Sequence, residues 1–354
     1  MRYTILTIVI LSAFLSSCKK DPETTEEIIS TDLQREILEE FTSNVAVDIY
    51  TELALHTVTL DENILLLVSE TSEINLNNCR QNWKDARLAW ERSEAFLFGP
   101  VATENIDPRI DTWPVNFQDL EGELASSNAF TAEYIDGLQD ALKGFHPIEY
   151  LLFGQDGNKT ASEFTTRELE YLAALSTNLR ELTSQLSLGW TSGDTNYSSS
   201  FAQAGNGSGV YSTKLSAYEE MVNAMIGICD EVANGKIGEP FLLQDPTLEE
   251  SPFSANSITD FTNNIKGVGT VYLGKYNADG LGIEDFVREH NLSLDAQIKQ
   301  ELAQCEAALI NITMPFGEAI TSQQVQVQAA IDAINQLAST LETDLLPLVQ
   351  LHID

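Results

Sequence analysis

The chain has 354 residues, and its 54 acidic residues far outnumber its 19 lysines and arginines, which gives a formal net charge of −35 at pH 7. Such an acidic surface repels phosphate backbones, so nucleic acid is excluded as a partner, whereas cations are attracted. The four cysteines form no CxxC pair, which excludes a zinc-type thiolate site. The chain is also long enough for two domains with buried free thiols and no disulfide support.

The N-terminus resembles the signal of a bacterial lipoprotein. Arg2 is followed by an apolar run over residues 5–15 that is too short to span a bilayer, and a Leu-Ser-Ser-Cys sequence similar to a lipobox ends at Cys18. We therefore expect residues 1–17 to be a signal peptide, Cys18 to be lipidated, and residues 18–31 to form a flexible tether. The alternative is an ordinary signal peptide with a chance cysteine. The lipoprotein interpretation predicts an extracytoplasmic protein anchored to a bacterial membrane, at the outer membrane or the cell surface.

Apolar residues recur at spacings of 3 and 4 along most of the remaining chain, which predicts helices and almost no strands. The predicted helices cover residues 33–55, a segment capped by Asp61, and residues 82–98, 131–153, 165–188, 211–233, 256–273, 294–312 and 318–346. Residues 104–114 and 235–252 are expected to be irregular, because prolines or glycines interrupt them.

The composition changes over residues 189–209, where Gly, Ser, Asn and Thr replace most aliphatic residues. We therefore predict an all-α fold of two helical-bundle domains, residues 32–190 and 211–354, joined by a Gly/Ser-rich loop at 191–210. Each half contains a helix that ends in an apolar-Gly sequence, which raises an internal duplication as a hypothesis.

One of the four histidines, His146, stands three residues before Glu149. Residues three apart share a helix face, so this imidazole and carboxylate can point at one object and form half of a metal site. Gly144 and Pro147 interrupt the predicted helix beside the histidine. Either they kink the helix and aim the side chain, or they mark a helix start.

A second pair with this spacing is Glu91 and Glu94. Helical bundles that bind two irons use Glu and His in such pairs, so four ligand groups converge if the two helices face each other. The alternative is that both glutamates are solvated and pair with neighbouring arginines. Asp107 and Asp111 follow as further oxygen ligands or, alternatively, as a helix cap or partners of Arg109.

Standard hydrolase and nucleotide-binding motifs are missing from the sequence. It contains no HExxH, GxSxG or Walker loop, and Tyr150 stands where an HxxEH motif has its second histidine. A standard zinc protease is therefore not expected.

The Gly-x-His-x-x-Glu sequence at residues 144–149 resembles the signature of the imelysin family. Residues 83–100, 106–114 and 250–274 are similar to imelysin-like proteins as well, so the resemblance covers nearly the whole mature chain. It implies an all-helical fold of two bundle-like domains with a site near their interface. It also implies a bacterial lipoprotein linked to iron uptake, because the family is related to the metal-binding domain of periplasmic iron-uptake lipoproteins.

The resemblance also implies which residues form the site. The metal ligands it implies are His146, Glu149, Glu91, Glu94 and either Asp107 or Asp111. The residues that it places along the cleft are Arg87, Trp90, Arg109, Trp113, Gly144, Ser251 and Ser254.

We therefore expect a metal-binding lipoprotein that takes part in iron uptake, with other iron-uptake proteins as partners. Carboxylate oxygens and an imidazole nitrogen suit iron, with zinc and copper as alternatives. The alternative function is a metallopeptidase that uses His146 and Glu149, with Glu149 as the catalytic residue. A third hypothesis is a module that binds a peptide or a haem-like ligand without a metal.

Overall fold

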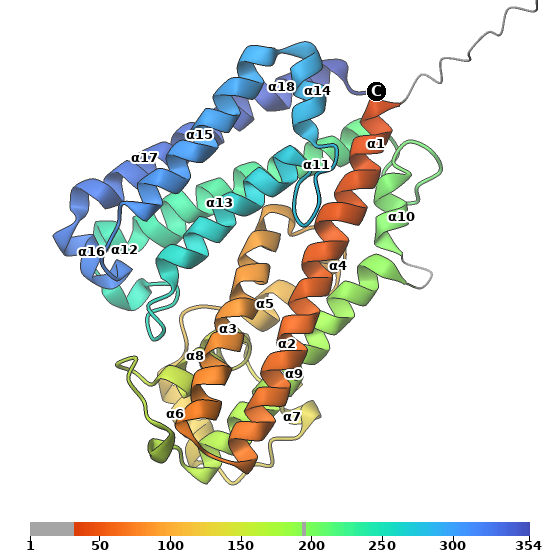
Figure 1. Ribbon diagram of the computed structural model, residues 1–354. Helices are drawn as coiled ribbons and strands as arrows, with labels where there is room; N and C mark the ends of the chain where they lie inside the picture. Colours follow the sequence, from red (N-terminus) through yellow and green to blue (C-terminus); the bar gives the residue numbers. More distant parts are fainter. Residues whose placement is uncertain (1–31, 193–195) are drawn as a thin grey trace, which may run out of the picture. The chain divides into compact units, whose positions relative to one another are not determined.

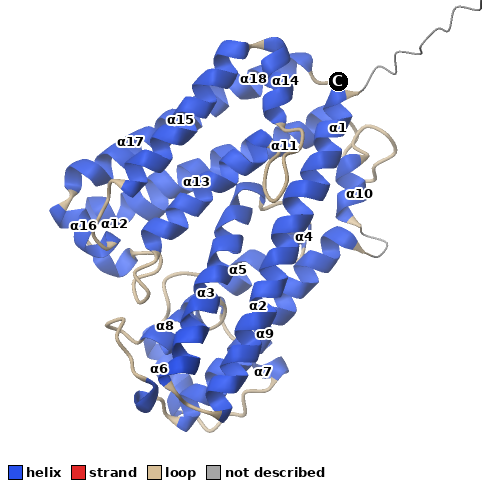
Figure 2. Cartoon of the chain, in the orientation of Figure 1, coloured by secondary structure: helices blue, strands red, loops and turns tan. Residues whose placement is uncertain are grey.

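Helices make up most of the computed structural model, which describes residues 32–192 and 196–354 (Figure 1, Figure 2). Within these ranges there is no strand, and one isolated bridge joins Lys275 to Asp279. The predicted all-α fold is therefore confirmed. Asp32–Asp354 form one compact unit. The predicted signal peptide and tether lie outside the described residues.

The helices of the first half are α1 Leu33–Glu40, α2 Val47–Ser69, α3 Glu73–Ser93, α4 Pro100–Thr103, α5 Ile106–Asp111, α6 Phe117–Ala125, α7 Ala132–Asp136, α8 Phe145–Phe153, α9 Thr166–Thr191 and α10 Tyr197–Ala202. Those of the second half are α11 Lys214–Asp230, α12 Gly238–Leu243, α13 Ser257–Leu273, α14 Ile283–His290, α15 Leu292–Ile310, α16 Phe316–Ser322, α17 Gln324–Thr340 and α18 Leu346–His352. Wider π-helical turns occur at Phe41–Ala46, Glu231–Ile237 and Leu341–Leu345. Tighter 3-10 turns occur at Glu94–Phe96, Asp140–Leu142, Ala161–Glu163 and Pro246–Leu248.

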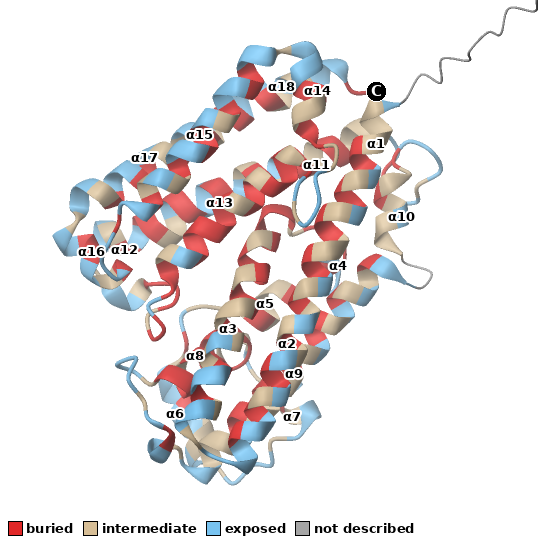
Figure 3. Ribbon diagram, viewed as in Figure 1, coloured by how far each residue is buried: buried red, intermediate tan, exposed pale blue. Residues whose placement is uncertain are grey.

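The helices pack in two groups that meet where α13 contacts α3. In the first group α2 packs against α3 and α9, and in the second α15 packs against α13 and α17 (Figure 1). The buried faces of both groups turn inward and share one apolar core (Figure 3). Cys79, Cys229 and Cys305 lie buried there as free thiols, as predicted. Since α10 lies within residues 191–210, that segment is not only a loop, and the division into two domains stays a prediction.

The contact between α3 and α13 is close because Gly267 of α13 faces α3. A Cβ atom at Gly267 would lie 2.4 Å from the carbonyl oxygen of Arg92, far inside van der Waals contact. The missing side chain lets the two backbones approach. One turn earlier, α13 places Asn264 against the carboxylates of Glu91 and Glu94. These two glutamates therefore lie where the two helix groups meet.

The first long helix differs from its prediction. A π-helical turn joins α1 to α2, and α2 continues to Ser69, so Asp61 lies inside a helix and caps nothing. Its buried carboxylate accepts a hydrogen bond from Ser176 of α9 at 2.7 Å and pairs with Arg180 at 3.1 Å. The cap prediction is wrong because the hydrogen-bond partner of Asp61 lies 115 residues away in the sequence.

The segment predicted as one helix over residues 131–153 is three pieces. It consists of α7, a 3-10 turn and α8, and Gly144 precedes α8 with a positive φ of 82°. Pro147 is the third residue of α8, where a backbone N–H has no partner within the helix in any case. Of the two predicted alternatives, Pro147 therefore marks a helix start and does not kink a longer helix.

The segment predicted as irregular over residues 104–114 contains α5. Pro108 is the third residue of this short helix, where a backbone N–H has no partner within the helix, and buried Ile106 and Ile110 anchor the helix to the core. Asp107 and Asp111 consequently lie one helical turn apart on one short element. Asp111 is its last residue and faces the start of α8.

Gly144 sets the distance between α5 and α8. Its positive φ is one that side chains with a Cβ atom rarely adopt, and a Cβ atom there would lie 2.2 Å from the carbonyl oxygen of Ile110. We expect Gly144→Ala to lower the free energy of unfolding by roughly 3 kcal/mol, from backbone strain and steric overlap together. Urea denaturation measures this loss.

Gly207 provides a matched control, because it has a φ of +87° but nothing within 4 Å of an added Cβ atom. Gly207→Ala should therefore cost only the backbone strain, about 1 kcal/mol. Equal losses in the two variants would show that the close approach to Ile110 does not matter.

Candidate metal centre

An acidic cavity of about 400 Å³ opens beside α5 and the π-helical turn at Glu231–Ile237. Six carboxylates line it, and Lys236 is the one basic residue in the lining, within the described part of the chain. The acidic lining residues are Glu94, Asp107, Asp111, Glu231, Glu239 and Glu250. The cavity thus concentrates negative charge between the two helix groups.

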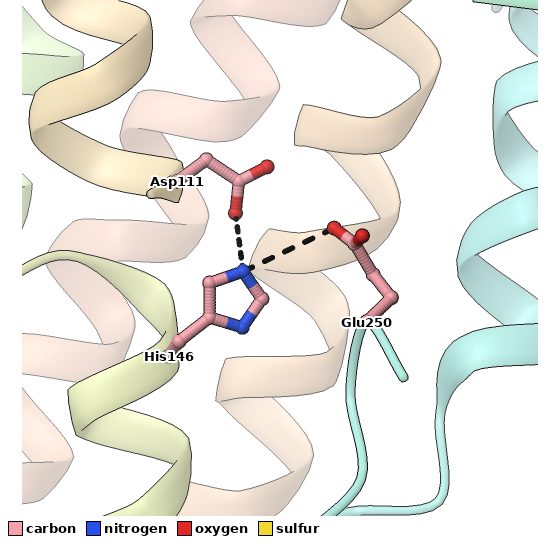
Figure 4. A group of neighbouring side chains, drawn as sticks. All are labelled: Asp111, His146 and Glu250. Carbon is pink, nitrogen blue, oxygen red and sulfur yellow. Dashed lines mark ion pairs between the residues drawn. The ribbon is translucent and has the colours of Figure 1, made fainter. Parts of the chain in front are cut away.

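His146 is completely buried and does not line the cavity itself, but it lies beside two residues of the lining, Asp111 and Glu250. Its Nε2 atom lies 3.1 Å from Asp111 Oδ1 and 3.9 Å from Glu250 Oε1 (Figure 4). Its Nδ1 atom lies 3.7 Å from Glu149 Oε2. Among the described residues, neither ring nitrogen of His146 has an aligned hydrogen-bond partner. The contacts of the ring with the carboxylates are therefore charge pairs, in which neither nitrogen makes a hydrogen bond.

The carboxylates keep His146 protonated. Burial by itself lowers the pKa of an imidazole, but Asp111 and Glu149 outweigh burial and raise the pKa of His146 to about 9. In return, His146 and the guanidinium of Arg87 hold the pKa of Asp111 well below its usual range, although burial acts to raise it. The indole Nε1 of Trp90 donates to Asp111 Oδ2 at 2.6 Å and fixes that carboxylate from the other side.

Glu149 lies on the opposite edge of the imidazole from Asp111 and Glu250. Its Oε1 atom accepts two hydrogen bonds from Ser254, from the backbone N–H at 2.7 Å and from Oγ at 2.6 Å. The other oxygen, Oε2, has no hydrogen-bond partner among the described residues and turns toward His146 Nδ1. Glu149 is therefore placed to orient the imidazole, in the way that carboxylates hold metal-binding histidines from behind.

Glu91 and Glu94 form the second half of the cluster at the end of α3. The side-chain amide of Asn264 donates to Glu91 Oε2 at 2.7 Å and to Glu94 Oε2 at 2.6 Å. Burial and the charge of Glu91 raise the pKa of Glu94 well above its usual range, against the opposing effect of Lys236. Both side chains are buried, so the predicted alternative is wrong about solvation, but Glu91 does pair with a neighbouring arginine, Arg87, as that alternative expected.

Two positive side chains lie inside the acidic cluster. Arg87 is fully buried and pairs with the carboxylates of Glu91, Asp111 and Glu250. Lys236 Nζ lies 2.8 Å from Glu94 Oε2 and 3.4 Å from Glu250 Oε1. Burial opposes both charges, but the surrounding carboxylates raise the pKa of each well above its usual value.

Within residues 32–192 and 196–354, two groups of side chains could hold a metal ion, with one ligand atom from each residue within 4.8 Å of the others. The first is Asp111, His146 and Glu250, and the second is Glu91, Glu94 and Asp111. Asp111 belongs to both groups. Asp107 belongs to neither, although it lines the cavity, where burial and the charge of Asp111 raise its pKa to about 6.

The residues predicted to line the cleft have varied positions. Trp113 lines the cavity, with its ring centre 5.0 Å from that of His146. Ser251 is buried and donates to Asp260 at 2.6 Å. Arg109 is turned away and pairs with Asp136. The positions of Arg87, Trp90, Gly144 and Ser254 are those described above.

Four further residues of the cluster had no role predicted from the sequence: Glu250, Lys236, Asn264 and Asp260. Glu250 stands at the start of a segment that resembles the imelysin family. This resemblance was the sequence signal that could have identified Glu250 as a site residue. Lys236 lies in a segment broken by glycines, where the spacing of apolar residues does not predict which side chains are buried. Asn264 and Asp260 belong to the one face of α13 that buries polar residues against α3.

Comparison with known proteins agrees with the expected family. The imelysin family model matches residues 46–341. Iron-regulated protein A of Synechococcus elongatus is 31% identical over 325 residues, which cover 90% of this chain and 87% of that protein.

Solved structures share the fold. A protein of Parabacteroides distasonis, described as an iron-regulated protein A precursor, superposes with a TM-score of 0.81 at 24% identity, over 91% of this chain and 95% of that chain. An imelysin-like protein of Psychrobacter arcticum gives a TM-score of 0.72 at 15% identity, over 91% of this chain and 97% of that chain. The match over most of the chain confirms the resemblance of the Gly-x-His-x-x-Glu sequence, and the chain belongs to the imelysin family.

Proposed function

We propose that this protein is an extracytoplasmic lipoprotein that binds a metal ion, with iron as the expected metal, in the acidic pocket and takes part in iron uptake. One observation carries the proposal: buried His146 Nε2 converges with the carboxylates of Asp111 and Glu250, and these two carboxylates line an acidic cavity. The name of the relative in Synechococcus elongatus, an iron-regulated protein, supports the choice of metal.

The donor set fits a first-row transition metal. Carboxylate oxygens are hard ligands and imidazole nitrogen is a borderline one, and the nearest buried thiols belong to the core and not to this pocket. We assign His146, Asp111 and Glu250 as the first ligands, with Glu91 and Glu94 supplying further oxygens. Glu149, which the family resemblance suggests as a ligand, takes the role of holding His146 through Nδ1.

The position of Glu149 favours binding over hydrolysis. A metallopeptidase needs a general base beside an open position on its metal. Glu149 faces the Nδ1 edge of His146 and is fixed there by Ser254, whereas Asp111 and Glu250 face the Nε2 edge. The carboxylate that would act as base is therefore on the side of the ring away from the proposed metal ligands.

Metal titration by calorimetry, with Fe²⁺ under anaerobic conditions and Zn²⁺ in parallel, tests the assignment. We expect His146→Ala and Glu250→Gln to abolish measurable binding, because each removes a ligand. Ser254→Ala, which only loosens Glu149 behind the imidazole, should weaken binding by about 10- to 100-fold.

Asp61→Asn is the matched control, since it neutralises a carboxylate equally buried but placed between α2 and α9. It should lower stability and leave metal affinity unchanged. Wild-type affinity in both His146→Ala and Glu250→Gln would overturn the proposed site.

The peptidase alternative has a separate test. Zn²⁺-loaded protein is incubated with an unfolded protein substrate, and fragments are followed by mass spectrometry. We expect no cleavage above that of Glu149→Gln. Cleavage by the wild-type protein that disappears in Glu149→Gln would favour the peptidase function over metal capture.

The proposed lipid anchor rests on Cys18, which lies outside the described residues. No helix in residues 32–192 or 196–354 is long and apolar enough to cross a membrane. Expression in bacteria with labelled palmitate should label the wild-type protein and the control Cys79→Ala, and leave Cys18→Ala unlabelled and in the soluble fraction. A label that persists in Cys18→Ala would contradict the anchor.

A further inference from the structure

The ammonium of Lys236 contacts carboxylates that a bound cation would also contact. Its Nζ atom lies 2.8 Å from Glu94 Oε2, 3.4 Å from Glu250 Oε1 and 3.7 Å from Glu91 Oε2. All three partners belong to the two groups that could hold a metal ion. The ammonium of Lys236 thus lies among three buried carboxylates, of which Glu91 and Glu250 also pair with Arg87 and Glu94 does not.

Arg87 also lies in the cluster, but its side chain is held in place, whereas the side chain of Lys236 is free to move. The Arg87 side chain is fully buried, lies over the ring of Phe145 at 5.2 Å and is surrounded by carboxylates from several elements. Arg87 does not line the cavity. Lys236 lines the cavity itself, so its flexible four-carbon stem can carry the ammonium outward along an open path.

The backbone under Lys236 supports such a movement. Lys236 lies on the π-helical turn at Glu231–Ile237, between α11 and α12, and this turn forms one wall of the cavity. Turns of this kind are irregular, and they recur at functional sites. The neighbouring Gly235 leaves open space, since a Cβ atom there would meet only Glu231 Cγ at 3.9 Å.

We propose that Lys236 is an exchangeable counter-cation of the acidic pocket: its ammonium neutralises Glu94, Glu91 and Glu250 while no metal is bound, and it swings to the cavity mouth when a multivalent cation enters. The inference rests on the proposed metal-binding function and adds the residue that regulates it.

Electrostatics explains both halves of the exchange. Buried carboxylates without a positive partner are strongly destabilising, so the empty pocket needs a resident cation. Attraction to the same carboxylates scales with charge, so a divalent or trivalent ion gains more there than one ammonium does. A monovalent ion has no such advantage, and Lys236 therefore also discriminates against sodium and potassium.

Two substitutions test the effect on affinity. Lys236→Met removes the charge but keeps an unbranched stem, and we expect Zn²⁺ and Fe²⁺ affinity by calorimetry to rise at least roughly tenfold as the competing charge is lost. The melting temperature of the metal-free variant should fall, and its rise on metal addition should exceed that of the wild type. Lys236→Arg keeps the charge and should show no gain in affinity.

Amine labelling of the wild-type protein tests the movement itself. Acetylation followed by mass spectrometry should find Lys236 protected without metal and reactive with Zn²⁺, but protected in NaCl of equal ionic strength. Lys143 is the matched control, because it is similarly buried but held by the carbonyl oxygens of Asp136 and Leu138. Lys275, which is exposed, should react throughout.

The outcomes separate the two proposals. Metal binding by the wild type with unchanged Lys236 labelling, or without a gain of affinity in Lys236→Met, overturns the exchange and leaves the metal site standing. Absence of metal binding in the wild type overturns both. If Lys236→Met does not fold, the labelling of the wild type decides, since it needs no variant.

Discussion

Arg87 joins the parts of the pocket, because carboxylates from separate elements share its buried guanidinium. Glu91 comes from the same helix, whereas Asp111 ends α5 and Glu250 precedes α13. A buried charge that loses its partners is strongly destabilising, so none of these elements can move away alone. The positions of the candidate ligands therefore follow from one charge network, and the helix packing around it provides the low-dielectric setting that strengthens it.

The imidazole of His146 depends on this network in turn. Arg87 and Trp90 fix Asp111, and Asp111 faces Nε2, while Ser254 fixes Glu149, which faces Nδ1. The ring is thus oriented from both edges. The proton on the imidazole neutralises part of the surrounding negative charge, and the proposed ligation of a metal through Nε2 would require the loss of that proton.

Helical spacing was enough to predict the pairs Glu91–Glu94 and His146–Glu149, because residues three apart share a face wherever a helix forms. It could not assign their roles. Glu250 pairs with Arg87 across 163 residues of sequence, and no local period encodes such a contact. The orientation of Glu149 depends on Ser254, 105 residues further on. The same limit explains the error at Asp61, whose charge is stabilised by a distant helix and not by a helix end.

The balance of charge separates this pocket from an ordinary buried ion-pair network. Among the described residues, six buried carboxylate side chains, including those of Glu149 and Asp260, are within 4 Å of the three positive groups Arg87, Lys236 and His146, so the acids are in excess. The excess is partly relieved by protons: burial raises the pKa of Asp260 to about 8 and that of Glu94 well above its usual range. Burying charge in this way adds little to stability compared with apolar packing, so stability alone does not account for the arrangement. Excess carboxylates beside an open cavity, with protons and the ammonium of Lys236 among their partial counter-charges, agree with the proposed capture of cations.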